Sequence, residues 1–192
     1  MKIGVLAAQG AFIEHIHALE NLNVKAAEIR LPEHLEGLDG LIIPGGESTT
    51  ISKLIIAYGL EDTIKSKIET GMAVFGTCAG MIMLARNIVD GNGVQPLKVM
   101  DITVRRNAFG RQVDSFETEL KIDAIGKKPF HAVFIRAPLV EKVGRGVEVL
   151  SRLHDGTIVA AKQGKILGCS FHPELTDDTR LHQYFLDLAA SN

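Results

Sequence analysis

The strongest constraint on the fold is the alternation of short apolar runs with segments of helical period in the first half of the chain. The apolar runs are continuous, which is typical of strands buried on both faces. They lie at Ile3–Ala8, Val24–Leu31, Leu38–Ile43 and Met72–Phe75. Segments with helical spacing separate or follow them, at Ala11–Leu22, Ser48–Tyr58 and Ala79–Ile88. This order predicts a parallel sheet covered by helices on both faces.

The second half of the chain has strand-like runs joined by short, glycine-containing connections. Asp155-Gly156 stands between two such runs and predicts a hairpin, and a last helix is expected over Thr176–Ala190 with Thr176 as its cap. Because no repeat, linker or low-complexity segment interrupts the 192 residues, we expect one α/β domain over residues 1–192. Its central sheet should be mostly parallel, with antiparallel additions from strands at Asp101–Arg105, Phe116–Ile122, Ala132–Ile135, Glu148–Leu153, Thr157–Ala161 and Ile166–Phe171.

Composition excludes several classes of function. The 21 Lys and Arg against 23 Asp and Glu leave a net charge of −2, which does not favour nucleic-acid binding. Two cysteines are too few for a disulfide scaffold or a multi-cysteine zinc module. No apolar run approaches the roughly 20 residues that span a membrane, and Glu14 and His15 come too early for a secretory leader. We therefore expect a cytoplasmic protein that binds neither nucleic acid nor membranes.

The segment Phe75-Gly76-Thr77-Cys78-Ala79-Gly80 carries the clearest chemical signal. A strand runs into a turn that holds Cys78 and an apolar helix leaves it, as in the G-x-S-x-G nucleophile elbow with Cys in place of Ser. Gly76 permits the strained turn, and Gly80 permits a close backbone approach. The helix N-terminus favours the thiolate, and the N–H of Ala79 is placed to stabilise an oxyanion. The alternative is a small core cysteine at a strand-to-helix joint.

A catalytic thiol needs a base, and the base needs an orienting group. His172 is the histidine whose context offers both, because His172-Pro173-Glu174 follows the strand-like run Ile166–Phe171. A residue before proline favours extended geometry, so His172 and Glu174 should face the same side. Glu174 would then hold the tautomer of His172 while the other ring nitrogen faces Cys78. The alternative is a strand end with a capping carboxylate.

The remaining cysteine and histidines fit structural roles. Cys169 lies on the opposite face of its strand from His172, beside Phe171, so we expect a core residue. His15 and His17 resemble a metal pair, but side chains two residues apart on a helix point away from each other, and no third ligand is evident. We therefore expect no metal site. Surface or structural roles are assigned to His34, His131, His154 and His182.

The segment Pro44-Gly45-Gly46-Glu47-Ser48-Thr49-Thr50 follows a predicted strand and opens a helix. It lacks the lysine of a P-loop, but it lies at the carboxyl end of a parallel strand, where open α/β sheets bind ligands. A second oxyanion donor from Gly46, with Glu47 and Ser48 lining the pocket, fits attack on a carbonyl better than a phosphate cradle. The alternative is a turn followed by an N-cap at Glu47 or Ser48.

Taken together, these motifs resemble a known family. In chain order they are Pro44-Gly-Gly-Glu-Ser-Thr-Thr50, Gly76-Thr-Cys-Ala-Gly80, Arg106-Asn-x-Phe-Gly-Arg-Gln-Val-Asp-Ser-Phe116, Phe134-Ile-Arg-Ala-Pro138 and Ser170-Phe-His-Pro-Glu-Leu175. Over essentially its whole length the chain resembles the glutaminase subunits of pyridoxal 5′-phosphate synthases, which are class I, triad-type glutamine amidotransferases. Ile82 stands where class I glutaminases usually carry a substrate-contacting Gln, and this departure agrees with the pyridoxal branch. The resemblance implies a three-layer, flavodoxin-like fold.

The resemblance also implies an activity, a partner and a site. The chain would hydrolyse L-glutamine to L-glutamate and ammonia through a cysteine thioester, with no cofactor or metal of its own. It would deliver the ammonia to the pyridoxal 5′-phosphate synthase subunit for vitamin B6 biosynthesis. The implied triad is Cys78, His172 and Glu174, and the implied oxyanion hole is Gly46 and Ala79. Implied glutamine contacts, with an arginine for the α-carboxylate, are Gly46, Glu47, Ser48, Arg106, Ile135 and Arg136, and Gln9 is a candidate for coupling to the partner.

Two other functions fit the same motifs. A partner-independent cysteine amidase or peptidase on a similar elbow fold would turn over its substrate without the synthase subunit. A catalytically silent regulatory module would keep its function after Cys78→Ala. The intact set of Cys, His and Glu disfavours the silent module.

Overall fold

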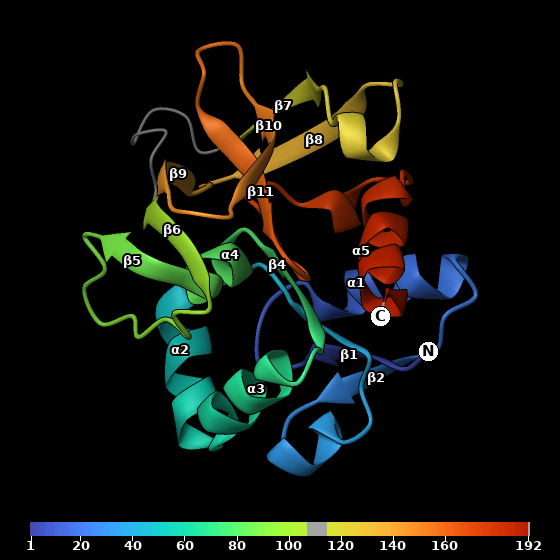
Figure 1. The fold of residues 1–192 in the computed structure, drawn as a ribbon, viewed down its shortest axis with the longest axis vertical. Helices are drawn as coiled ribbons and strands as arrows, with labels where there is room; N and C mark the ends of the chain where they lie inside the picture. The colour runs from blue at the N-terminus through green and yellow to red at the C-terminus, as the bar shows by residue number, and fades with distance from the viewer. Residues whose placement is uncertain (107–114, 192) are drawn as a thin grey trace.

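A computed structural model describes residues 1–106 and 115–191 (Figure 1). Its ten-stranded sheet has the order β2-β1-β3-β4-β12-β11-β9-β6-β5, and β10 pairs with β11. Neighbours from β2 to β12 run parallel. Taken along the chain, their order is the 2-1-3-4-5 of flavodoxin-like folds, which confirms the predicted parallel half. These strands are β1 (Ile3–Leu6), β2 (Ala26–Ile29), β3 (Gly40–Ile43), β4 (Ala73–Thr77) and β12 (Ile166–Cys169).

The second half of the chain extends this sheet mainly with antiparallel strands, as predicted. β11 pairs antiparallel with β12, β9 and β10, and β9 also pairs antiparallel with β6. The turn between β10 and β11 places Gly156 at φ +89, and Asp155 accepts a hydrogen bond from the N–H of Thr157. β7 and β8 form a separate antiparallel pair. The added strands are β5 (Ala85–Val89), β6 (Met100–Arg105), β7 (Ser115–Leu120), β8 (Phe130–Ile135), β9 (Leu139–Val143), β10 (Glu148–Arg152) and β11 (Ile158–Gln163).

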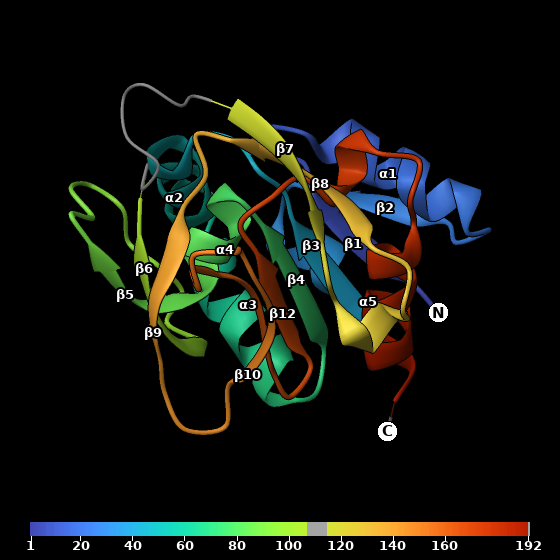
Figure 2. The ribbon, with the colours of Figure 1, turned by 90° about the horizontal axis from the view of Figure 1, so that it is seen from above.

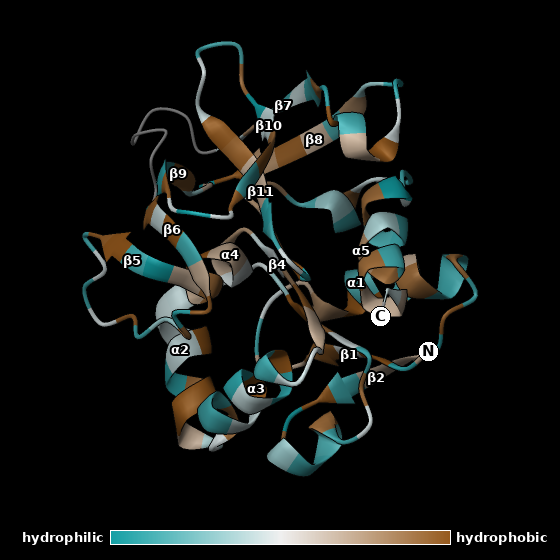
Figure 3. Cartoon of the chain, in the orientation of Figure 1, coloured by the Kyte–Doolittle hydropathy of each residue, from teal (hydrophilic) through white to brown (hydrophobic). Residues whose placement is uncertain are grey.

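Helices cover both faces of the parallel half and complete three layers (Figures 1 and 2). One apolar cluster packs α1 (Phe12–Asn21) and α5 (Arg180–Ala190) on the sheet, and the other packs α2 (Ser48–Ala57), α3 (Leu60–Glu69) and α4 (Ala79–Leu84). The covering helices mix hydrophobic and hydrophilic residues, as Figure 3 shows. Within the described ranges, no helix has the length and apolar character to cross a membrane. Short 3₁₀ helices are η1 (Pro32–Leu35), η2 (Asp123–Ile125) and η3 (Pro173–Leu175).

Two predicted helices have different bounds in the structure. The helix expected over Ala79–Ile88 ends at Leu84, because the chain then becomes extended and pairs with β6 as strand β5. The helix expected from Thr176 begins at Arg180. The Thr176 hydroxyl accepts the N–H of Asp178, whose carboxylate accepts the N–H of Arg180, so local side-chain bonds stabilise a turn in place of the first helical turn. Helix α3 and strand β9 were not predicted.

Candidate active site

Cys78 occupies a strained turn between β4 and α4. Its backbone angles are φ 49 and ψ −107, a conformation that side chains other than glycine rarely adopt. Its N–H donates to the carbonyl of Cys169 at 2.8 Å. A Cβ on Gly80 would stand 1.8 Å from the carbonyl oxygen of Ile43, so glycine is required where α4 crosses the end of β3. The predicted elbow geometry is present, and the role of Cys78 as nucleophile stays a prediction that this geometry supports.

His172 and Glu174 meet just after β12, in a conformation that differs from the predicted one. The chain does not stay extended: Pro173–Leu175 forms a turn of 3₁₀ helix, for which the fixed φ of Pro173 is suited. His172 Nδ1 nevertheless lies 2.7 Å from Glu174 Oε1, and the Glu174 side chain is fully buried. The N–H of His172 also donates to the carbonyl of Val133 at 2.8 Å. Glu174 therefore fixes Nδ1 of the ring and leaves Nε2 for another partner.

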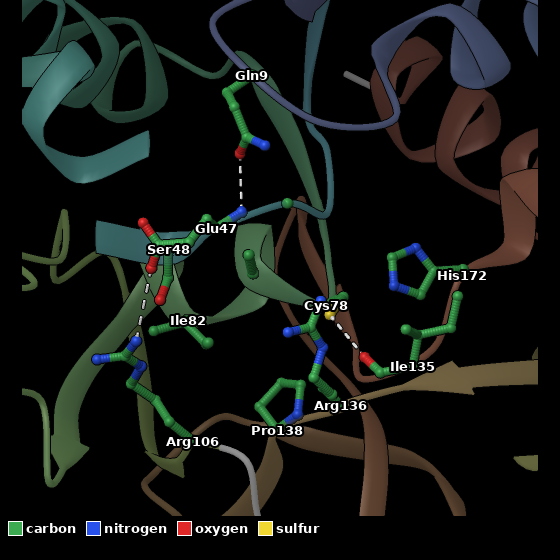
Figure 4. A pocket seen from close by; sticks show the side chains of 12 residues that line it. Gln9, Glu47, Ser48, Cys78, Ile82, Arg106, Ile135, Arg136, Pro138 and His172 are labelled. Carbon is green, nitrogen blue, oxygen red and sulfur yellow. Dashed lines mark hydrogen bonds and ion pairs between the residues drawn. The ribbon is translucent and has the colours of Figure 1, made fainter. Parts of the chain in front are cut away.

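The environment of His172 favours its charged form. Burial by itself lowers the pKa of His172, but hydrogen bonds to Cys78 and Glu174 outweigh burial and raise the pKa to about 10. The imidazole therefore keeps its second proton at neutral pH, close to the sulfur. Figure 4 shows the His172 ring on the same side of the pocket as Cys78. A protonated imidazole beside a thiol is the arrangement that activates cysteine nucleophiles.

The glycine loop after β3 packs directly against this pair. A Cβ added to Gly45 would stand 2.4 Å from His172 Cε1 and 3.2 Å from Cys78 Cβ, so a larger residue would displace one of them. The N–H of Gly45 donates to the Thr77 hydroxyl at 3.1 Å, and its carbonyl accepts the N–H of Ala11 at 3.2 Å. The loop is thus held on one side by the end of β4 and on the other by the start of α1.

The two backbone N–H groups predicted to stabilise an oxyanion, those of Gly46 and Ala79, belong to residues that line the pocket. Across a trans peptide the carbonyl of one residue and the N–H of the next point in opposite directions. Since the Gly45 carbonyl is turned toward Ala11, the N–H of Gly46 points to the opposite side, and Gly46 lines the same pocket as Cys78. Ala79 is the first residue of α4, so its N–H has no acceptor inside that helix.

Gln9 and Glu47 fix the start of α2. The side-chain oxygen of Gln9, in the loop after β1, accepts the N–H of Glu47 at 2.7 Å. The Glu47 carboxylate caps α2, since it accepts the Thr50 hydroxyl and the N–H groups of Thr49 and Thr50. The Thr50 hydroxyl contributes most to lowering the pKa of Glu47 to about 2. Glu47 is therefore both the predicted N-cap and a permanent negative charge at the pocket rim.

These groups surround one cavity of about 430 Å³, the size of site that takes a small molecule (Figure 4). Every predicted site residue except Glu174 lines it, and Glu174 lies buried against His172. Arg106 Nη2 stands 3.8 Å from Glu47 Oε1, and the carbonyl of Ile135 stands 3.8 Å from the Cys78 sulfur. The lining residues are Gln9, Gly46, Glu47, Ser48, Cys78, Ala79, Ile82, Arg106, Ile135, Arg136, Pro138 and His172.

Three further predictions concern Cys169, the Arg106–Phe116 motif and metal binding. Cys169 is fully buried in the cluster that contains Phe171, as its place on the strand predicted. The part of the Arg106–Phe116 motif at residues 107–114 lies outside the described residues. Within the described part of the chain, no group of His, Cys, Asp and Glu is arranged to hold a metal ion.

Sequence reasoning missed the roles of two buried polar residues next to the pocket, His15 and Thr77. His15 lies 3.1 Å from the Thr77 hydroxyl and 3.4 Å from Glu174, and all three side chains are buried. The available signal was helical spacing: His15 shares the buried face of α1 with Ala18 and Leu19, three and four residues on. A histidine on the apolar face of a helix needs a buried polar partner.

Comparisons with known proteins agree on one family. A model of the SNO glutamine amidotransferase family matches residues 5–191. The chain is 59% identical to the pyridoxal 5′-phosphate synthase subunit PdxT of Dehalococcoides mccartyi over 98% of this chain and 97% of that protein. It is 57% identical to the protein of the same name from Thermus thermophilus, over 97% of each. A crystal structure of a glutamine amidotransferase has a TM-score of 0.93 at 55% identity, covering 98% of this chain and 99% of the other. PurLQS from Thermotoga maritima shares the fold, with a TM-score of 0.72 at 15% identity over 97% of each chain.

Proposed function

Because this chain belongs to the SNO glutamine amidotransferase family, we propose that it hydrolyses L-glutamine to L-glutamate and ammonia, with Cys78, His172 and Glu174 as its catalytic triad. The observation that carries the assignment of residues is the meeting of three features in one cavity. Cys78 stands on a strained elbow, the protonated ring of His172 lies beside it, and Glu174 holds that ring at 2.7 Å.

The first half of the reaction forms a thioester. The Cys78 thiolate attacks the side-chain carboxamide carbon of glutamine, and the carbonyl oxygen becomes an oxyanion between the N–H groups of Gly46 and Ala79. His172 Nε2 then gives its proton to the departing nitrogen, which leaves as ammonia. Glu174 remains ionised throughout and stabilises the charged ring that begins this step.

The second half releases glutamate. His172, now neutral, takes a proton from a water molecule, which attacks the γ-glutamyl thioester at its carbonyl carbon. The same two N–H groups stabilise the second oxyanion, and its collapse expels the Cys78 thiolate. The product carboxylic acid gives up its proton to solvent, and the thiolate and the protonated ring are restored.

The cations of the pocket suit the other end of the substrate. Free glutamine carries an α-carboxylate, which the planar forks of Arg106 or Arg136 bind through charge-assisted hydrogen bonds. Glu47 stays negative at all working pH values, because its pKa is lowered to about 2. Ser48, Ile82 and Ile135 complete the lining around the side chain of glutamine.

We infer that the ammonia passes to a pyridoxal 5′-phosphate synthase subunit, because full-length relatives at 57 to 59% identity carry that synthase in their names. Gln9 is our candidate for coupling to that partner, since it anchors the loop that supplies the Gly46 N–H. Residues 1–192 would act as one glutaminase domain, an inference that the continuous ten-stranded sheet supports. A cytoplasmic location fits two free cysteines, which stay reduced there.

The test is glutamate release measured with and without the synthase subunit, on matched cysteine variants. We expect the complex to release glutamate, and Cys78→Ala to lower kcat by about 10⁴-fold or more. Cys169→Ala removes a sulfur of the same kind from the core and should keep kcat within about twofold of the wild type. Absence of glutamate release from the wild-type complex would contradict the proposal. Equal turnover without the synthase subunit would favour the partner-independent amidase.

A further inference from the structure

A fully buried imidazole connects two parts of the active site. His15 on α1 has no exposed surface, and its Nδ1 lies 2.9 Å from Nε2 of His182 on α5. Its Nε2 lies 3.1 Å from the hydroxyl oxygen of Thr77, at the end of β4, and 3.4 Å from Glu174 Oε2. Both ring nitrogens therefore face polar atoms, as a buried imidazole requires.

These neighbours determine which ring nitrogen carries the proton. Glu174 Oε1 is taken by His172, whereas Glu174 Oε2 is buried, lacks a hydrogen-bond partner within residues 1–106 and 115–191, and faces His15 Nε2. A carboxylate can only accept, so a proton on His15 Nε2 is favourable and a bare Nε2 would be repelled. His15 Nδ1 then accepts from His182 Nε2–H. The remaining bare atom is His182 Nδ1, a buried nitrogen for which no partner is found among the described residues.

The two imidazoles stay neutral. Burial, followed by the nearby rings of His182 and His172, lowers the pKa of His15 well below its ordinary value. Burial also lowers the pKa of His182 to about 4. His15 can therefore place a neutral N–H 3.4 Å from Glu174 Oε2 without neutralising the carboxylate charge that His172 requires.

The second contact of His15 leads to the oxyanion loop. The Thr77 hydroxyl that faces His15 Nε2 also accepts the N–H of Gly45 at 3.1 Å. Gly45 packs against the ring of His172 and precedes Gly46, which lines the pocket. One side chain thus contacts the carboxylate that orients the catalytic ring and the hydroxyl that anchors the oxyanion donor.

We propose that His15 is a positioning residue for the glutamine hydrolysis proposed above. Its Nε2–H holds the Thr77 hydroxyl, which anchors the loop at Gly45 and Gly46, and presents its positive end to the second oxygen of Glu174 at 3.4 Å. The electrostatic attraction between His172 and Glu174 changes each time the imidazole ring loses or regains its proton. A second donor on Glu174 keeps the carboxylate in place through this cycle, so that His172 Nε2 stays aimed at Cys78.

Two substitutions of His15 separate positioning from packing. The amide nitrogen of Gln reaches the place of Nε2, whereas Asn is shorter and reaches only the Nδ1 side. In the complex with the synthase subunit, His15→Asn should lower kcat by about 10- to 100-fold with little change in KM, because the Thr77 hydroxyl and the Glu174 carboxylate lose the N–H that faces both. His15→Gln should recover kcat to within about threefold of the wild type. His17→Asn, on the exposed side of the same helix, is the matched control and should leave kcat unchanged.

Two further measurements do not depend on glutamine turnover. The rate of Cys78 alkylation at acidic pH should fall in His15→Asn and stay at the wild-type value in His15→Gln. In wild-type protein with ¹⁵N-labelled histidine, NMR should show His15 as the neutral Nε2–H tautomer. If His15→Asn does not fold, this tautomer decides the question.

The outcomes are distinguishable from failure of the proposed function. A wild-type complex that releases no glutamate would reject glutamine hydrolysis, while the alkylation profile and the tautomer would still test His15. Equal loss of kcat in His15→Asn and His15→Gln would indicate packing alone and overturn the proposal. An Nδ1–H tautomer or a charged His15 ring would overturn it as well.

Discussion

Where β4 and β12 end, cysteine and histidine occur in two neighbouring regions with opposite properties. In the pocket, Cys78 and His172 contact each other, and the pKa of His172 is raised to about 10. In the core behind them, burial raises the pKa of the Cys169 thiol well above its ordinary value and lowers the pKa of His182 to about 4. Cys169 and His182 in the core therefore favour their neutral forms, whereas His172 in the pocket is charged.

The difference lies in the partners and not in the residue types. His172 has a buried carboxylate on Nδ1 and a thiol nearby, so its positive charge is compensated. His182 faces the neutral ring of His15, and nothing described compensates a charge there. Depth of burial alone therefore does not make a reactive site in this fold. A compensating charge and access from the pocket are both required.

The largest expected effect is a difference in alkylation between the two cysteines. In native protein at pH 7, iodoacetamide should modify Cys78 at least about 10³-fold faster than Cys169, because Cys169 must wait for an opening of the core that costs several kcal/mol. Peptide-level mass spectrometry measures both rates in one sample. In denaturant the two rates should converge. A native rate for Cys169 within about tenfold of that for Cys78 would contradict the contrast.

This contrast was largely predictable from local sequence. The elbow around Cys78 and the inward face of Cys169 follow from the residues around one turn and from alternation along a strand. The pairing of His172 with Glu174 was predicted from an extended chain, whereas the structure makes it through a 3₁₀ turn. The sequence did not predict where α4 ends, because Ala85–Val89 is apolar enough to continue a helix and becomes a strand through pairing with β6. It also missed His15, whose partner His182 is 167 positions away. Such contacts depend on the packing of whole helices, to which local patterns are blind.

A smaller effect is expected from removing the two histidine rings in turn. Without His172, no positive charge beside the Cys78 sulfur stabilises its thiolate. His172→Gln should therefore slow alkylation of Cys78 at pH 6.5 by about 100-fold. His182→Gln changes the core histidine in the same way and should stay within about twofold of the wild type. Equal alkylation rates for the two variants would remove the distinction between the regions.

The smallest effect concerns stability in acid, and it comes from the core. The pKa of His182 is about 4 in the folded state and about 6.5 in the unfolded state. At pH values between these two, the unfolded chain therefore binds a proton at His182 and the folded chain does not. The free energy of unfolding must then fall as the pH falls, by about 2 kcal/mol per such group from pH 6.5 to 5. Urea unfolding at pH 7 and pH 5 measures this fall in the free energy of unfolding, and the fall should be about 2 kcal/mol smaller in His182→Gln than in the wild type.

A surface histidine gives a control of opposite sign. Hydrogen bonds to Glu119 and then Glu117 raise the pKa of His131, so its contribution is present below the unfolded pKa and is lost as the pH rises through the folded one. His131→Gln should therefore make the acid loss slightly larger, where His182→Gln makes it smaller. If both variants lost stability in acid like the wild type, His182 would already carry a proton at pH 5 in the folded state. A charged His182 would still donate its Nε2–H to His15 Nδ1, so this result would remove the contrast between a neutral core and a charged pocket and leave the tautomer of His15 unchanged.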